Sequence, residues 1–328
     1  MKLNFVFRAH RLNSILVVLL LLLACIKNPV ENGKLPAENP YKLTRGGYPD
    51  WSPTGERLAF IWDNNLCLYY FDDKHIEKVT ENATEPSFSP DGKKIAFERE
   101  RKIYTIDLET KQERYLAEGI TPSWSENGKW IVFANKDASR SLTDGTIVYG
   151  SPTQDSCLYY YDLTFGQVES VRVSLFWTRW ERPPLSFFEP EWAEGDSTVL
   201  FTTEAGIWKV RRWGGKAVPA GSNFDITNAK LSKASQYTWS AQSCWNTKYR
   251  LMAFFRGEDL APFGGIWRYI YIVRLKLYAS LGGIGAGSHP TWSPSGVDIA
   301  FFNSEDGYLW EKDVSETVEF LVNHPFDP

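Results

Sequence analysis

Residues that bind metals or act as nucleophiles are scarce in this sequence. Only four of the 328 residues are histidine and four are cysteine. No His-Glu-x-x-His, Gly-x-Ser-x-Gly or Gly-x-x-x-x-Gly-Lys motif occurs, and no two histidines have the spacing of metal ligands. These absences remove the usual motifs of a zinc peptidase, a serine hydrolase and a phosphate-binding loop. We therefore predict that the protein has no metal, no cofactor and no enzymatic activity.

Cysteine is also too sparse for a disulfide framework. Beyond Cys25, the chain contains Cys67, Cys157 and Cys244, which is an odd number in three distant segments. Cys67 and Cys157 both begin the phrase Cys-Leu-Tyr-Tyr, so we expect them at equivalent positions of a repeated unit. Buried small apolar side chains are the expected role.

Long apolar runs are absent except for one, residues 15–24. Lys2, Arg8 and Arg11 precede this run, which is shorter than the roughly 20 residues that a membrane-spanning helix needs. The arrangement predicts a signal peptide over residues 1–24. Residues 25–40 contain several prolines and little apolar content, so we expect a tether.

Residues 22–25, Leu-Leu-Ala-Cys, resemble the lipobox of bacterial lipoproteins. The resemblance implies lipidation at Cys25, which would hold the protein on a membrane by its N-terminal lipid. Ile26 stands where an inner-membrane retention signal would have Asp, which favours the outer membrane if the organism has one. A plain signal peptide and an uncleaved anchor are the alternatives.

Positive charge is in deficit. The chain has 36 Lys and Arg against 40 Asp and Glu, a net charge of −4, and removal of residues 1–24 would leave 33 against 40, or −7. A mildly acidic chain is a poor general binder of nucleic acid, so we expect no nucleic-acid partner.

One short phrase recurs six times. It consists of an aromatic residue, a tight turn and a closing Phe, with the two aromatic residues always nine positions apart. In five copies proline stands two positions before the first aromatic, which we call the anchor aromatic. The pairs are Trp51 and Phe60, Phe88 and Phe97, Trp124 and Phe133, Trp192 and Phe201, Trp245 and Phe254, and Trp292 and Phe301. Each copy predicts two antiparallel strands.

A second pair of strand-like runs follows each phrase, for example 158–162 and 168–173 in the third copy. Four short strands in about 40 residues are typical of a β-propeller blade. A single twisted sheet cannot bury both faces, whereas blades packed around a ring can. We predict an all-β fold after the signal peptide, in which residues 41–328 form a six-bladed β-propeller of four-stranded antiparallel blades. The recurring Trp and Phe would form the core between blades.

The phrase at residues 86–97, Pro-Ser-Phe-Ser-Pro-Asp-Gly-Lys-Lys-Ile-Ala-Phe, resembles the repeat of the TolB-type six-bladed propellers. With its other copies the resemblance covers residues 41 to 322. Two segments could supply the strand that closes the last blade: 41–44 and 317–322. The sequence leaves this choice open.

Insertions interrupt the regular spacing in the second half of the chain. Successive anchor aromatics are 37, 36, 68, 53 and 47 residues apart, and the longest interval is too short for a seventh blade. The extra residues fall in 135–155, 174–189, 221–242 and 256–265. In an up-and-down blade these loops share one face, so we predict that this face binds a partner. The second insertion is rich in Trp and Arg, residues typical of binding hot spots, and a plug over its own blade is the alternative. Its candidates are Phe176, Trp177, Arg179, Trp180 and Arg182.

A second candidate site lies at the mouth of the central channel. The residue before each opening proline, or its equivalent, should reach the channel rim. These six rim residues are Tyr48, Glu85, Thr121, Glu189, Gln242 and His289. They could hold a peptide or a cation, and the simpler alternative is that they only bond strand ends and channel water.

These observations favour a binding or scaffold protein in the cell envelope, facing the periplasm or the cell exterior. We expect a monomer that engages a protein, peptide or glycan through the loop-rich face. The alternative is a propeller enzyme, a polysaccharide lyase or hydrolase, with Glu85, Glu189 and His289 as its reactive groups.

Overall fold

The computed structural model describes residues 41–135, 158–171, 173–175, 188–203, 206–220, 238–259, 266–274, 280–281, 285–303 and 305–323. These residues belong to one compact unit, Pro40–Pro328. The predicted signal peptide, Cys25 and the predicted tether therefore lie outside the described residues, as does Cys157. Among the described residues no helix has the length and apolar character needed to cross a membrane.

The first three sheets are built from consecutive strands. Blade 1 contains β2 (Gly47–Trp51), β3 (Arg57–Trp62), β4 (Asn65–Tyr70) and β5 (Ile76–Glu81). Blade 2 contains β6 (Thr84–Phe88), β7 (Lys94–Arg99), β8 (Lys102–Asp107) and β9 (Glu113–Glu118). Blade 3 contains β10 (Ile120–Trp124), β11 (Trp130–Ala134), β12 (Leu158–Asp162) and β13 (Gln167–Val171).

The last three sheets include two departures from simple chain order. Blade 4 contains β15 (Phe188–Ala193), β16 (Thr198–Thr203), β17 (Gly206–Arg211), β18 (Gly215–Pro219) and, at its outer edge, β14 (Val173–Leu175). Blade 5 contains β19 (Thr238–Asn246), β20 (Leu251–Asp259), β21 (Ile266–Arg274) and β22 (Ser280–Leu281). Blade 6 contains β23 (Ser288–Trp292), β24 (Asp298–Asn303), β25 (Tyr308–Asp313) and β1 (Tyr41–Arg45).

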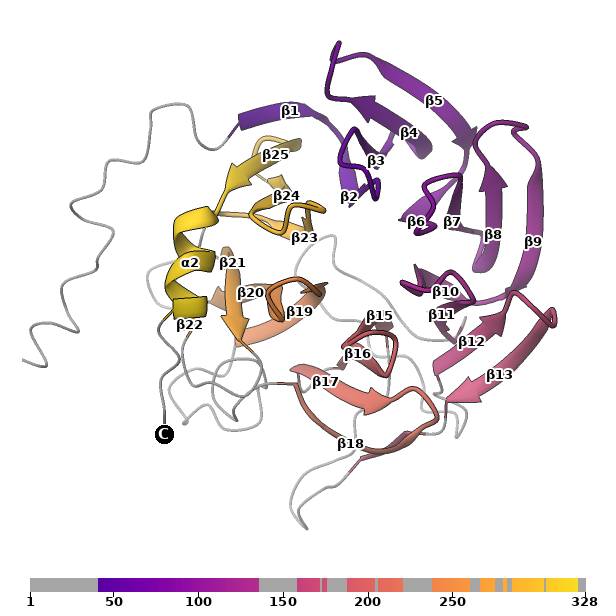
Figure 1. Ribbon diagram of the computed structural model, residues 1–328. Coiled ribbons are helices and arrows are strands. Elements are labelled where there is room, and N and C mark those ends of the chain that lie inside the picture. The colour runs from indigo at the N-terminus through magenta and orange to yellow at the C-terminus, as the bar shows by residue number, and fades with distance from the viewer. Residues whose placement is uncertain are drawn as a thin grey trace, which may run out of the picture. The chain divides into compact units, whose positions relative to one another are not determined.

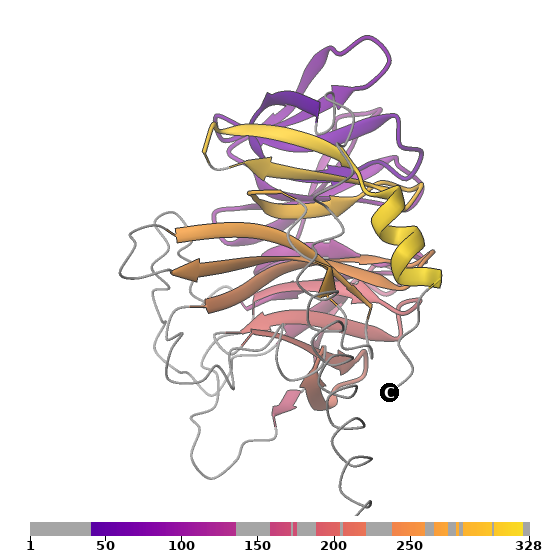
Figure 2. The same cartoon turned by 90° about the vertical axis from the view of Figure 1, so that its left-hand side faces the viewer.

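The sheets form a closed ring of six blades (Figure 1). The inner strands contact one another in the cyclic order β2, β6, β10, β15, β19, β23 and back to β2. In the side view, the strands of blade 5 (orange) and blade 6 (yellow) run across the ring from one face to the other (Figure 2). The six-bladed β-propeller predicted from the repeats is confirmed.

β1 closes blade 6. It pairs with β25 in antiparallel register, with Lys42 opposite Trp310. The Lys42 ammonium lies 3.5 Å from the centroid of the Tyr308 ring and 3.1 Å from the Asp306 carboxylate. The other candidate segment, 317–322, lies in the helix α2 (Ser315–Asn323). The buried side chains of Val318 and Leu321, three positions apart, pack on the core between blades 5 and 6, as one face of a helix requires.

The third blade ends earlier than its sequence suggests. We expected a fourth strand over 168–173, but β13 stops at Val171. The next residues, β14, pair in parallel with β18, so Val173 lies opposite Gly215. β14 therefore belongs to blade 4, which it extends to five strands.

Local bonding explains why the recurring turn forms. In blade 2 the Gly92 N–H donates to the Ser89 carbonyl at 2.8 Å, and Gly92 has φ of 69°, a value glycine adopts without strain. The Asp91 carboxylate accepts the Ser89 hydroxyl and the Lys93 N–H at 2.6 and 3.0 Å. The phrase Ser-Pro-Asp-Gly thus supplies its own hydrogen-bond partners.

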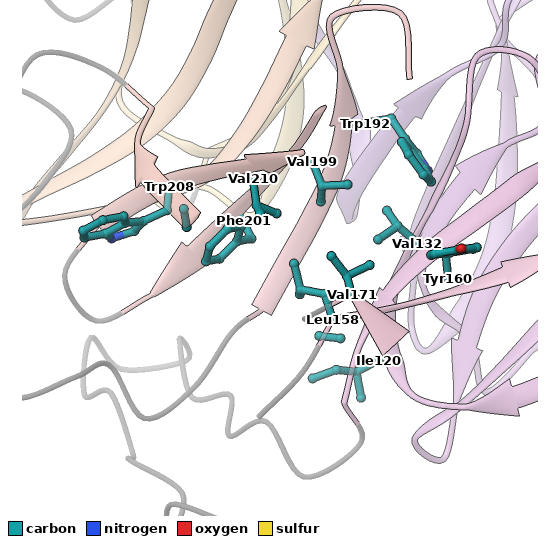
Figure 3. Close-up of a cluster of buried hydrophobic side chains, with 12 residues drawn as sticks. Ile120, Val132, Leu158, Tyr160, Val171, Trp192, Val199, Phe201, Trp208 and Val210 are labelled. Atoms are coloured by element: carbon teal, nitrogen blue, oxygen red, sulfur yellow. The ribbon is translucent and has the colours of Figure 1, made fainter. Parts of the chain in front are cut away.

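The core lies between blades. All six closing phenylalanines are at most 2% exposed. Figure 3 shows the cluster between blades 3 and 4, where Leu158 and Tyr160 of β12 face Val199 and Phe201 of β16. The anchor aromatics are buried as expected with one exception: Trp124 is only half-buried.

Candidate functional site

The six rim residues occupy the same unusual backbone position in every blade. Each has a positive φ of 50–54°, which is uncommon for residues other than glycine. In each blade the pairing of the inner strand with its neighbour shifts by one residue at this point. Such a β-bulge redirects a side chain. All six rim side chains line one cavity of about 140 Å³.

Side chains of the rim bond the backbone of the next blade. The Glu189 N–H donates to the Thr121 hydroxyl at 3.3 Å. The Gln242 N–H donates to the Glu189 carboxylate at 2.9 Å, and the His289 N–H donates to the Gln242 side-chain oxygen at 3.0 Å. Four successive blades, 3 to 6, are therefore joined at the rim by side-chain-to-backbone hydrogen bonds.

The His289 imidazole is held on three sides. Its Nε2 lies 2.7 Å from the Gln242 side-chain nitrogen, which donates to it, and its Nδ1 lies 3.0 Å from the Ser288 hydroxyl. The Tyr48 ring packs edge-on against it, with ring centroids 4.3 Å apart. These contacts fix the ring plane across the boundaries between blades 5, 6 and 1.

A second layer of polar residues lines the cavity two positions further along each inner strand. Three of them accept the N–H of the next blade's anchor aromatic. The Phe88 N–H donates to Asp50 at 2.7 Å, the Trp124 N–H donates to Ser87 at 2.9 Å, and the Trp245 N–H donates to Glu191 at 2.9 Å. We did not predict this layer from the sequence. Its signal was present, because the residue before the anchor aromatic is Asp, Ser, Ser, Glu, Cys and Thr in the six copies.

Burial changes the acidity of this second layer. It raises the pKa of Asp50 to about 7 and that of Glu191 to about 8, because a carboxylate loses its hydration there. The charge of Asp50 raises the pKa of Glu191 further. The pKa of the Cys244 thiol is also raised, first by burial and then, to a smaller extent, by the negative charge of Glu191. The channel therefore holds two carboxyl groups that take up protons close to neutral pH.

The lining of this cavity is acidic and polar. It includes Asp50, Glu85, Glu189 and Glu191, and among the described residues no Lys or Arg contributes to it. A narrow cavity of this kind favours a positively charged or hydrogen-bond-donating group over an anion. Its volume accommodates a few waters or a single side chain and is too small for a folded domain.

The rim lies on the same face as the insertions. The predicted insertions fall between β11 and β12, β14 and β15, β18 and β19, and β20 and β21. In this strand order, all four connections leave and re-enter the ring on the face where the inner strands begin, which we call the loop face. The opposite face carries the Pro-Asp-Gly turns, and we call it the turn face. Most inserted residues, including Phe176, Trp177, Arg179, Trp180 and Arg182, lie outside the described residues.

One cluster with potential metal ligands occurs in the described part of the chain, and it lies away from the channel. Asp72, Asp73 and His75 are exposed in the turn between β4 and β5. His75 Nδ1 is 2.5 Å from the Asp73 carboxylate, and the ring stacks on Tyr70 at 4.1 Å. The cluster is therefore explained by contacts within the turn, in which Asp73 and Tyr70 hold the His75 ring.

Comparison with known proteins identifies the fold. No protein-family model and no curated protein sequence matches the chain. Among solved structures, an Agrobacterium tumefaciens protein assigned to TolB aligns with a TM-score of 0.55 and 15% identity over 84% of this chain and 96% of that one. An oligogalacturonate lyase from Vibrio parahaemolyticus aligns with a TM-score of 0.53 and 14% identity over 87% and 93%. A chain of the mitotic checkpoint complex aligns with a TM-score of 0.51 and 11% identity over 86% and 98%.

These similarities place the chain among the β-propellers. They bear out the resemblance to TolB-type propellers at the level of the fold. At 11–15% identity they carry no information on ligand or reaction.

Proposed function

We propose that this protein is a binding or scaffold protein of the cell envelope, which engages a protein or peptide partner through the loop face of its propeller. The observation that carries the proposal is the convergence of two features on that face. Three residues from each of the six blades, including the rim residue, line a single polar cavity, and the four insertions connect strand ends around the same face. Binding residues are commonly presented by loops on a rigid scaffold in this way.

The chemistry of the cavity indicates which part of a partner enters it. The carboxyl groups in its lining include Glu85 and Glu189 at the rim, and no Lys or Arg is among the described lining residues. A lysine or arginine side chain, or a free amino terminus, matches this charge. The inserted segment with Trp177, Arg179 and Trp180 would supply the larger contact area around it, since Trp and Arg dominate binding energies. A glycan is the remaining class of partner.

The location follows from the N-terminal segment. Residues 22–25 resemble a lipobox, so we propose that Cys25 carries the lipid that holds a monomeric propeller on the membrane. The tether, residues 25–40, would give the ring freedom to meet partners on other components of the envelope. The protein would face the periplasm or the cell exterior.

A crosslinking pull-down from living cells tests the proposal. The variant replaces residues 176–187 with a Gly-Ser segment of the same length, which preserves β14 and β15. The matched control exchanges exposed residues of the turn face, such as Glu109→Ala. A partner captured by the native chain and the control, but lost from the variant, supports binding through the loop face. Equal capture by all three forms contradicts it.

The enzyme hypothesis remains a second candidate because its three residues line one cavity. Glu189 and His289 are both bonded to Gln242, and Glu85 lines the same space. Both ring nitrogens of His289 are engaged by neighbours, however, which leaves neither free to act as a base in this arrangement. Incubation with oligogalacturonides, the substrate class of the Vibrio enzyme, tests this candidate. Product formation that is lost in Glu189→Gln would favour it.

A further inference from the structure

The turn face contains a cleft between blades 2 and 3 that the proposed function does not use. Its volume is about 730 Å³, within the range of roughly 300–1,000 Å³ of small-molecule sites. Its walls come from the Pro-Asp-Gly turn and outer strands of blade 2 and from the corresponding turn of blade 3. Trp124, Pro90 and Leu163 supply its apolar surface.

One covering contact seen in two other blades is absent at the cleft. In blades 1 and 3 the side chain six positions after the anchor aromatic contacts the anchor aromatic of the next blade. Arg57 lies 5.8 Å from the ring of Phe88, and Trp130 lies 6.1 Å from Trp192. The equivalent residue of blade 2 is Lys94, whose ammonium instead bonds Asp107 at 2.6 Å. The next anchor aromatic, Trp124, is half-buried and lines the cleft.

A second position beside Trp124, in blade 3, also lacks an aromatic side chain. In blade 1 the residue after the third strand is Phe71, which stacks on Trp51 at 4.7 Å with an interplanar angle of 2°. In blade 3 the same position is Leu163, as the equivalent backbone bonds of Phe71 N–H to Glu56 and Leu163 N–H to Lys129 show. Leucine has no ring to stack on the indole. Trp51 is 8% exposed and the three other buried anchor tryptophans are 3–8% exposed, whereas Trp124 is half-buried and faces the cleft.

The polar groups around Trp124 are numerous and largely neutralised. Lys94 is paired with Asp107, and its hydrogen bond lowers the pKa of that carboxyl. Glu113 is paired with Arg99 at 2.6 Å. Further donors and acceptors in the wall include Thr105, Gln112, Arg114 and Asn127. The remaining charged residues of the wall, Asp91 and Arg114, have opposite signs, so the wall, counted with Arg99, carries no net charge. An aromatic surface flanked by such hydrogen-bonding groups is suited to an uncharged ligand rich in hydroxyl groups.

We propose that this cleft is a binding site for a neutral carbohydrate. The C–H face of a sugar ring would pack on the indole of Trp124, since the face of an aromatic ring is electron-rich. The sugar hydroxyls would exchange hydrogen bonds with Asp91, Gln112, Asn127 and Arg114, whose side chains offer both acceptors and donors. The site lies on the turn face, opposite the channel rim, so it is independent of the partner site on the loop face.

The test transfers the covering residue of blade 1 into blade 3. The purified full chain is titrated with maltohexaose, cellohexaose, xylohexaose and chitohexaose, and binding is followed by calorimetry and by saturation-transfer NMR of the sugar. At least one of them binds saturably to the native chain. Leu163→Phe places a ring over Trp124 and weakens that binding by about tenfold or more. Leu163→Met, which preserves the volume, keeps the affinity within about threefold.

Three outcomes would overturn the proposal: no saturable binding of any of these sugars, unchanged affinity in Leu163→Phe, or equal loss in Leu163→Met. If Leu163→Phe fails to fold, Gln112→Ala tests the proposal in its place. Gln112 is an exposed residue of the cleft wall, and its loss should weaken sugar binding. Capture of a partner at the loop face is measured on the same variants. Partner capture should remain intact in a variant that has lost only sugar binding, so the failure of the sugar-site proposal can be distinguished from the failure of the loop-face proposal.

Discussion

Gln242 and His289 are joined twice across the boundary between blades 5 and 6. The Gln242 side-chain oxygen accepts the His289 N–H at 3.0 Å, and its nitrogen lies 2.7 Å from the imidazole Nε2. A single amide therefore fixes both the backbone and the ring of the histidine. A single side-chain-to-backbone hydrogen bond joins Thr121 to Glu189, and another joins Glu189 to Gln242. The rim thus has a structural role in addition to any binding that it performs.

Replacing this amide should weaken the ring. Gln242 is 6% exposed, so Gln242→Ala removes two hydrogen bonds and leaves the partly buried His289 N–H without its Gln242 acceptor. We expect a loss of about 1–3 kcal/mol in the free energy of unfolding, measured by urea denaturation. Lys248→Ala, at an exposed position on the turn face of the same blade, is the control. A loss no larger than that of the control would show that the rim bonds do not stabilise the fold.

The buried carboxyls should make stability depend on pH. The folded chain raises the pKa values of Asp50 and Glu191 from 3.8 and 4.5 to about 7 and about 8. A raised pKa means that the folded state binds the proton more tightly. The stabilisation is therefore present below about pH 4 and is lost as the pH rises towards 8.

Glu191→Gln isolates this effect. Glutamine still offers an oxygen to the Trp245 N–H, but it carries no charge at any pH. We expect the melting temperature of the variant, relative to the native chain, to be higher at about pH 9 than at about pH 5. Parallel pH profiles of the two proteins would contradict the assignment of Glu191 as a buried acid.

The anchor tryptophans should differ in their contribution to stability. Trp192 is 3% exposed and donates its indole N–H to the Ser123 carbonyl at 3.1 Å. Trp192→Ala should cost about 3–5 kcal/mol, as the loss of a buried aromatic usually does. Trp124→Ala should cost clearly less, about 1–3 kcal/mol, because part of its ring already faces the cleft. Equal losses in chemical denaturation would mean that Trp124 is as buried as its equivalents.

Membrane attachment should depend on one residue. Cys25→Ala removes the sulfur that a lipobox lipid would occupy, so the protein should move from the membrane fraction to the soluble fraction of lysed cells. Cys67→Ala is a suitable control, since Cys67 is buried in blade 1. Continued sedimentation of Cys25→Ala with membranes would refute the lipid anchor.

The sequence by itself determined the number of blades, the position of each inner strand and the six residues that meet at the mouth of the cavity, and their role in binding stays a prediction. This was possible because each blade is formed by local antiparallel pairing, and Trp51 and Phe60, like every later pair, keep a fixed distance along the chain. The turn residues were readable for the same reason, since Asp91 and Gly92 bond only their immediate neighbours.

Only the tertiary structure decided the features that depend on contacts between blades. β1 rather than residues 317–322 closes the ring, because closure joins the two ends of the propeller and is not specified by local pattern. The pKa values of Asp50 and Glu191 depend on burial at the common axis. Trp124 is half-buried in a cleft where Lys94 turns to Asp107 and Leu163 lacks a ring, and these two side chains lie 30 and 39 residues away from it along the chain. Local repetition builds the blades, and packing around the ring determines how each of them differs.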